Sequence, residues 1–440
     1  MPLLDDYSGP FDPDRKLSDF SREFLVRLGQ EYLLIGHLFD RVSQPLVAMS
    51  HGAKGYLDSG IQEWMGASPI YAKRMQRLMN FEGSSVETIF KGIQLEVGAP
   101  QQFMDFQFRL DSPEYGEFWL PHCGALMDVE PHGEVGVKLM CHDIEDPTFD
   151  ATAAATHPNM VMRPIHRPPR VDGPGGNGIG RTPHCRWKVY LSDEVQPYEQ
   201  HPNLAIVAGS LLAEVPIDRP PQDGEPGGWS DYSGEFDTAM QLADFSHSAL
   251  SALVQEFAVQ AHLLVRSYHV CVGGNWGEDE ARDLGRRASI GHAALAVERM
   301  KRLPGAKAQA KEGGIENVAK FIQLHPLFQP RTYVNLQVEL TGERSARVSI
   351  GDCPAVQEKE DRAYFSALGD APPPLLEAMV RQVDPQAVCS STKRSASERF
   401  AWEVEIDPSA EPVAAPDELN LAKMSTGMRF KFEARRRLRT

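Results

Sequence analysis

The chain has 440 residues, of which 42% are hydrophobic and 24% are charged, the balance of a globular protein long enough for two or three domains. Its formal net charge of −16 repels phosphate backbones, so we expect no nucleic-acid partner. We also expect no membrane span, because no apolar run is long enough, and a cytoplasmic location, because six cysteines accompany an N-terminus without an export signal.

An internal repeat is the strongest organisational signal. The motif Asp-Tyr-Ser-Gly at residues 6–9 recurs at residues 231–234, an offset of 225 residues. Arg74 and Arg299 match at the same offset, and beyond residue 80 the offset drifts to 229 and 230. Matches without gaps over this length predict two homologous halves.

Each half is predicted to begin with helices and to end with a small, mainly antiparallel sheet. Hydrophobic residues at three- and four-residue steps predict a long first helix, and the period changes to two after residue 103. The elements expected in the first half are helices at 20–39, 58–79, 84–95 and from 146, and strands at 103–110, 117–121 and 186–191. The predicted fold class is therefore α+β, internally duplicated.

We divide the chain into four segments. The first repeat covers 1–213, and a linker rich in proline and glycine covers 214–230. The second repeat covers 231–407. A further linker and a basic tail cover 408–440, and alternation at Met428–Phe432 predicts an edge strand in this tail.

Cysteine and histidine neighbours in the first half suggest where chemistry takes place. Thiolates, imidazoles and carboxylates bind zinc or iron, and they also serve as nucleophiles and as proton donors or acceptors. The candidate metal ligands are Cys123, Cys141, His184 and Cys185. The candidate catalytic residues are Cys141, His142 and Asp143.

The second half serves as an internal control for these candidates. Cys123 is matched by Cys353, which favours a structural role for this cysteine. Most of the other candidates are replaced: Leu368 and Gly369 stand opposite Cys141 and His142, and Arg399 and Phe400 stand opposite His184 and Cys185. We therefore predict one working half and one degenerate half. The competing interpretation is that the cysteines are ordinary core residues.

The order of Cys123, Cys141, Asp143 and Cys185 along helices and strands resembles that of the L-2-amino-thiazoline-4-carboxylic acid hydrolase family. The resemblance covers roughly residues 20–191. It implies hydrolytic opening of a small heterocycle that contains a C=N bond, with these four residues forming the site. The double length of the chain and its extra histidines depart from that pattern.

Two functions follow from these patterns. The first is a hydrolase that acts on a small metabolite with a C=N or amide bond, through one site in the first half. Such a site would be either assisted by zinc or iron or based on a thiol. The alternative is a duplicated ligand-binding or scaffold protein without enzymatic activity. Both functions imply a small-molecule partner or a second copy of the chain, and homo-oligomerisation is compatible with either.

Overall fold

The computed structural model describes residues 3–169, 183–194, 198–306, 311–358, 365 and 368–433. The helices of the first half are α1 (Arg22–His37), α2 (Asp40–Leu78), α3 (Val86–Ile93), α4 (Gly124–Val129), α5 (Gly133–Lys138), α6 (Glu145–Ala154) and α7 (Pro202–Ala208). Its strands are β1 (Gln107–Ser112), β2 (Tyr115–Leu120), β3 (Met160–His166) and β4 (Cys185–Leu191).

The second half repeats this order of elements. Its helices are α8 (His247–Trp276), α9 (Glu278–Met300), α11 (Ile315–Gln323), α12 (Pro354–Gln357), α13 (Pro374–Val383) and α14 (Asp417–Lys423). Its strands are β5 (Leu336–Leu340), β6 (Ser345–Gly351), β7 (Ala387–Ser391) and β8 (Glu398–Ile406).

Both sheets have the same topology within the described residues. Their orders are β1-β2-β4-β3 and β5-β6-β8-β7, and every neighbouring pair is antiparallel. Trp187 on β4 and Trp402 on β8 are equivalent and are fully buried in their respective halves. The predicted class, a duplicated α+β fold with helices followed by an antiparallel sheet, is confirmed.

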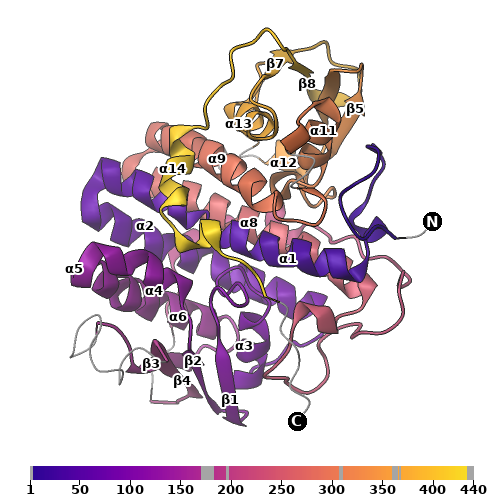
Figure 1. The fold of residues 1–440 in the computed structure, drawn as a ribbon. Coiled ribbons are helices and arrows are strands. Elements are labelled where there is room, and N and C mark those ends of the chain that lie inside the picture. The colour runs from indigo at the N-terminus through magenta and orange to yellow at the C-terminus, as the bar shows by residue number, and fades with distance from the viewer. Residues whose placement is uncertain are drawn as a thin grey trace.

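The long helices form the centre of the molecule. Figure 1 shows the two sheets at opposite ends, with α1, α2, α8 and α9 between them. Helix α1 packs along α8, and α2 packs against both α8 and α9. The helical chain bends at Gly52 in the first half and at Gly277 in the second, where φ is 67° and 96°. Only glycine adopts such positive φ angles readily, so both halves bend at the same place.

The two halves exchange contacts reciprocally. Lys91 on α3 donates a hydrogen bond to the carbonyl of Gly234 over 2.6 Å, and Lys320 on α11 donates to the carbonyl of Gly9. Each helix therefore binds the opening turn of the other half. The same exchange recurs in a second pair of bonds, Gln94 with Asp237 and Gln323 with Asp12.

Buried ion pairs follow the same rule. Arg74 bonds both oxygens of Glu256 at 2.9 and 2.7 Å, and Arg299 bonds both oxygens of Glu31 at 2.8 Å. These two bidentate pairs are equivalent at the offset of 225, and each joins the two halves. Since bidentate pairs fix geometry as well as charge, they define how the halves dock.

The second repeat extends beyond the predicted end at residue 407. Helix α7 and the 3-10 turn η4 (Leu212–Glu214) have counterparts in α14 and the 3-10 turn η7 (Thr426–Arg429). Arg74 donates to the carbonyls of residues 213 and 215, and Arg299 donates to those of residues 428 and 430. The offset is 215 in each case. Residues 417–430 thus repeat residues 202–215 and are part of the second repeat.

The strand predicted in the tail is wrong. The segment forms the turn η7 up to Arg429 and continues to Glu433 without strand pairing, because its carbonyls bond to Arg299 and Arg302 instead. In Figure 1 the yellow C-terminal segment runs from beside α9 toward the first half. The arginines at 435–437 lie outside the described residues.

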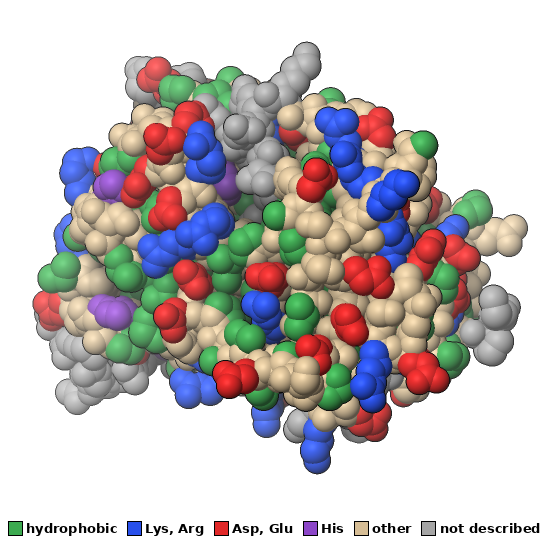
Figure 2. Space-filling model, turned by 90° about the horizontal axis from the view of Figure 1, so that it is seen from above, with side chains coloured by type: hydrophobic (Ala, Val, Ile, Leu, Met, Phe, Trp, Pro, Cys, Tyr) green, Lys and Arg blue, Asp and Glu red, His purple; other side chains and the backbone are tan. Residues whose placement is uncertain are grey.

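One helix in the described part of the chain is long and apolar enough to span a membrane. This helix is α8, whose most apolar stretch is completely buried inside the molecule, as expected for a central core helix. On the face shown in Figure 2, acidic and basic side chains are interspersed with scattered hydrophobic ones. The net negative charge is therefore not gathered into one patch on that face.

Candidate functional site

The three cysteines predicted from sequence lie in the core of the first half. Cys123 caps α4 by accepting a hydrogen bond from the backbone of Leu126, Cys141 lies in a π-helical turn, η3 (Leu139–Ile144), and Cys185 begins β4. Burial raises the pKa of Cys123 to about 12, and the carboxyl group of Glu145 contributes further. Burial also raises the pKa of Cys141 strongly, with contributions from Glu145 and from the other two thiols.

The raised pKa values of Cys123 and Cys141 limit the reactivity of these two thiols. A thiol must lose its proton to act as a nucleophile or as a metal ligand. Cys123 and Cys141 therefore remain protonated at neutral pH. Cys123 and Cys185 both contribute to the raised pKa of Cys141, so the three thiols lie in one neighbourhood.

The polar neighbours of these cysteines point in other directions. The Nε2 atom of His142 lies 2.6 Å from the carbonyl oxygen of Pro168. Asp143 is partly exposed and pairs with Lys138 at 2.8 Å. The backbone N–H of His184 donates to the carbonyl of Leu120. The structure thus brings the cysteines together but does not direct His142 and Asp143 toward them.

The proposed metal ligands do not form a metal-binding set. Within the described ranges of the chain, no group of three or more histidine, cysteine, aspartate or glutamate side chains is placed to hold a metal ion. Ligands of zinc or iron must converge on one point at about 2.0–2.3 Å. The described residues do not fit the zinc or iron that was expected from sequence, and no step is derived through such an ion.

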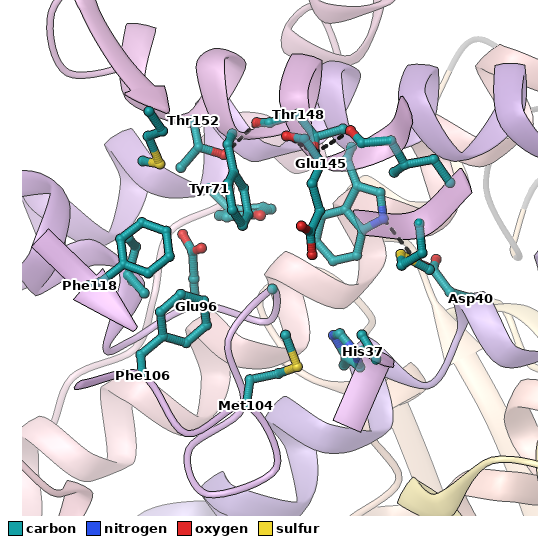
Figure 3. A pocket seen from close by; sticks show the side chains of 18 of the residues that line it. His37, Asp40, Tyr71, Glu96, Met104, Phe106, Phe118, Glu145, Thr148 and Thr152 are labelled. Atoms are coloured by element: carbon teal, nitrogen blue, oxygen red, sulfur yellow. Dashed lines mark hydrogen bonds between the residues drawn. The ribbon is translucent and has the colours of Figure 1, made fainter. Parts of the chain in front are cut away.

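A cavity lies between the helices and the sheet of the first half (Figure 3), and its lining includes Met140, the neighbour of Cys141 in sequence, but none of the three cysteines. Its volume is about 90 Å³, enough for several water molecules, and about 780 Å³ of space is free of atoms when the mouth is included. Its lining is mostly aromatic and aliphatic. The main apolar residues are Trp64, Ile93, Met104, Phe106, Phe118, Met140, Ile144, Phe149 and Met162.

Two carboxyl groups face this cavity from opposite elements. Glu96 follows α3, and Glu145 begins α6; Figure 3 shows both carboxyl groups pointing into the same space. Burial raises the pKa of Glu96 to about 7 and that of Glu145 to about 8, the latter opposed by Arg167. Glu96 is 8% exposed and Glu145 is partly exposed, and the side chains of these two residues accept no hydrogen bond from the described residues. A buried carboxyl without partners is costly, so both are candidates for ligand contact.

A second pair of acids lies at the edge of the cavity. The Nε1 atom of Trp64 donates to Asp40 over 2.9 Å, and Gln44 donates to Glu63 over 2.6 Å. Burial raises the pKa of both acids, and the proximity of Asp40 raises that of Glu63 further. The charges of the two carboxyls thus oppose one another, and the pair resists carrying both.

Arg41 and His37 complete the polar lining, and both have counterparts in the second half. Arg41 donates to Asp128 over 2.8 Å, as Arg266 pairs with Glu358 at 3.6 Å. Burial lowers the pKa of His37 to about 3, with Arg41 contributing, so this imidazole is neutral. Because both halves keep these residues, we interpret them as structural.

The acids, in contrast, are confined to the first half. At the offset of 225, Asp40 is replaced by Val265 and Glu63 by Ala288. The other replacements are Tyr71 by Ala296, Glu96 by His325, and Glu145 by a proline of the run 372–374. The same fold therefore forms without any of these groups, and their presence in one half is not required for folding.

The sequence contains one indication of this site, which is the replacement of its acidic residues in the second half. The site predicted from sequence was instead based on the cysteines. Comparing the polar residues of α2 with their counterparts in α8 and α9 includes Asp40 and Glu63 among the differences, but it also includes residues such as Ser59, which is replaced by Leu284. Glu96 and Glu145 are harder to find, because only the fold brings the residue after α3 to the residue that begins α6.

The cavity is interpreted from its own chemistry. Comparisons of the chain with protein-family models, with curated proteins and with solved structures give no match. The resemblance to the thiazoline carboxylic acid hydrolases stays an expectation from sequence. What the geometry places in the first half is a mostly apolar cavity lined by two carboxyl groups, a buried one on Glu96 and a partly exposed one on Glu145, that accept no hydrogen bond from the described residues.

Proposed function

We propose that the protein is a hydrolase whose active site is the cavity of the first half, and that it cleaves a C=N or amide bond in a small, possibly cyclic, molecule. One observation supports this most strongly. Glu96 and Glu145 face one apolar cavity without partners, and the second copy of the fold has neither carboxyl group. Acids retained in only one of two equivalent positions are more readily explained by chemistry than by packing.

The raised pKa values suit a division of labour between the two acids. Glu145, with a pKa of about 8, is mainly protonated at neutral pH and can donate its proton to the substrate nitrogen. Glu96, with a pKa of about 7, is partly ionised and can accept a proton from water as its oxygen attacks the carbon. In an amide the C–N bond then breaks as the nitrogen leaves with the proton from Glu145, and Glu96 retains the proton from water. At a C=N bond the hydroxyl group and the proton from Glu145 first add across the double bond. The remaining C–N bond breaks when Glu96 passes its proton to the nitrogen and Glu145 takes the proton of the hydroxyl group, which becomes the carbonyl. Two acids whose environments differ in this way are typical of acid–base sites.

Tyr71 supports the same assignment. Its hydroxyl lies beside the acids, and burial followed by the charge of Glu96 raises its pKa well above the usual value. It therefore remains a hydrogen-bond donor and can orient a substrate oxygen or nitrogen. The second half has Ala296 at this position, which again lacks the polar group.

The test is an activity screen against cyclic amides, amidines and thiazolines, with purified variants compared on every substrate that is turned over. We expect Glu145→Gln and Glu96→Gln to lower kcat/KM by about a hundredfold or more, because general acid–base catalysis contributes about 10² to 10⁴ in rate. Glu134→Gln, an exposed residue of α5, is the matched control and should leave turnover unchanged.

The thiol site predicted from sequence gives the opposite outcome. If Cys141→Ala abolishes turnover while Glu145→Gln and Glu96→Gln retain it, the cavity is not the active site. Since Ala is smaller than Cys, a melting curve of each variant must show that the fold is intact. We also propose a cytoplasmic location, in which all six cysteines remain the free thiols that the structure contains.

A ligand-binding protein without turnover is the second candidate. The mostly apolar lining favours it, because such cavities bind small molecules whether or not they transform them. In that case compounds of the screen raise the melting temperature but are recovered unchanged.

A further inference from the structure

The charge of the cavity restricts what can bind in it. Asp40, Glu96 and Glu145 are the carboxylic acids of its lining. Within the described lining, Arg41 is the one permanent cation, and its guanidinium is held by Asp128 at 2.8 Å. The imidazole of His37 is uncharged because its pKa is about 3. The cavity can therefore supply negative charge to a ligand but has no spare positive charge to offer.

The groups around each acid point to the same conclusion. Glu145 is opposed by Arg167, but the guanidinium of Arg167 is bonded to Asp146 and lies 5.5 Å from the ring of Trp187. Burial raises the pKa of Glu96 without an opposing cation, and its neighbour Tyr71 is neutral. A ligand that carries a cation would place beside both carboxyl groups the positive charge that the lining of the cavity does not supply.

The aromatic lining favours a cation with an apolar body. The rings of Trp64, Phe106, Phe118 and Phe149 line the cavity. Aromatic faces attract ammonium and amidinium groups, and they bury apolar rings and chains. An anionic ligand would meet the acids without a free cation to compensate.

We propose that the cavity recognises a small apolar or aromatic molecule through a basic nitrogen, an amine or an amidine, held between the carboxyl groups of Glu96 and Glu145. The proposal rests on the location of the site given above but not on its hydrolytic chemistry. It deepens that function by naming the substrate class: among C=N compounds and amides, those that carry a basic nitrogen are preferred over those that carry a carboxylate.

Binding of such a cation must displace protons from the protein. An ammonium group between the two acids favours their ionised forms and lowers both pKa values from about 7 and about 8. At pH 6.5 both acids are mainly protonated. Glu96, which has the lower pKa, loses its proton first, so binding of one cation should release up to roughly one proton while Glu145 keeps the proton that it donates to the substrate. A neutral ligand of the same shape releases none.

Isothermal titration calorimetry with benzylamine and with its neutral analogue benzyl alcohol tests the proposal. Titrations at pH 6.5 in two buffers of different ionisation enthalpy give both the affinity and the number of protons released. We expect benzylamine to bind at least about tenfold more tightly than benzyl alcohol and to release protons. Glu96→Gln should remove this preference and reduce proton release, whereas Glu134→Gln should change neither.

Three results would overturn the proposal. They are equal affinity for the two probes, no binding of benzylamine, and an unchanged preference in Glu96→Gln and Glu145→Gln alike. The comparison of probes on the unaltered protein needs no variant, so it stands even if a variant is unstable. Preferential binding of benzylamine together with the absence of turnover in the screen would sustain this inference and reject the hydrolase.

Discussion

Glu96 illustrates at the scale of one residue how a binding group differs from a structural one. The buried arginines Arg74 and Arg299 each bond both oxygens of a glutamate, which offsets the cost of burying charge. Glu96 is buried to a similar degree but has no such partner. The fold therefore carries an uncompensated acid, and its cost should be measurable.

The stability of the protein should depend on pH through this residue. The pKa of Glu96 rises from 4.5 in the unfolded chain to about 7 in the fold, which corresponds to roughly 3 kcal/mol of destabilisation. Because the folded pKa is raised, the destabilisation is absent below about pH 4.5, grows as the pH rises, and is complete above about pH 7.

Replacing Glu96 by Gln should consequently stabilise the protein at pH 8 and have little effect at pH 4.5. Urea unfolding of both proteins at the two pH values measures the difference. Glu134→Gln, whose side chain is exposed, controls for the change of net charge. An equal effect of Glu96→Gln at both pH values would show that the carboxyl is not perturbed by burial.

At the scale of elements, the terminal turn of each half reaches across to the other. In η7, Ser425 and Thr426 donate their hydroxyl groups to Asp128, both over 2.6 Å, and the backbone N–H of Thr426 donates over 2.7 Å. In the counterpart η4, the N–H of Leu211 donates to Glu358 over 3.2 Å. The acid that holds Arg41 at the cavity is thus itself held by the end of the chain.

Removing the two hydroxyl groups should loosen this arrangement. Hydrogen bonds to a charged acceptor contribute about 1.5–3 kcal/mol each, so Ser425→Ala with Thr426→Ala should lower stability by roughly 3–6 kcal/mol. Circular dichroism melts provide the measurement, and Ser409→Ala, in an exposed turn of the same half, is the control. If the double variant melts with the unaltered protein, the turn does not support Asp128.

The sequence predicted elements better than their ends. The repeat and the apolar periods predicted the duplicated order of helices followed by strands, because these signals are local or are duplicated in the chain. They missed β3, and they began the second helix at residue 58 although α2 begins at Asp40. The tail was misjudged for a physical reason: alternation at Met428–Phe432 has the period of a strand, but the carbonyls of residues 428 and 430 bond to the side chain of Arg299 instead of to a neighbouring strand. Only Leu419 and Ser425 recur from residues 204 and 210, too few to reveal the repeat.

The cavity lies in the same half as the site predicted from sequence, but its acidic residues Glu96 and Glu145 were not among the residues predicted. Cys141 and Glu145 lie four residues apart, and the thiol drew attention because thiols have many chemical roles. Which of these two side chains faces the cavity depends on the π-helical turn at Leu139–Ile144. Such a turn cannot be predicted from the sequence.

At the scale of the whole molecule, neither half is complete without the other. The reciprocal bonds of Lys91 and Lys320, and the two bidentate ion pairs, all cross between the halves. Interfaces of this kind are typical of obligate partners rather than of domains joined by a tether. The predicted linker is itself engaged, since Trp229 bridges to Phe245.

Cutting the chain after Gln222, in an exposed part of the linker, should therefore leave a protein that assembles from two pieces. We expect the fragments 1–222 and 223–440 to copurify in equal amounts when they are expressed together, and to be insoluble or unfolded when expressed separately. Size-exclusion chromatography and circular dichroism measure both results. A fragment that unfolds cooperatively on its own would contradict this dependence.

The contacts between the terminal turns and the opposite halves also determine when, during synthesis on the ribosome, the first half can reach its final structure. Every residue that lines the cavity has been synthesised by Met162. The partner of Lys91, however, is Gly234, and the hydroxyl groups that hold Asp128 come from Ser425 and Thr426. The first half thus emerges early and must wait for the last residues before its own cavity is complete, so a nascent or truncated chain should not bind ligand before synthesis ends.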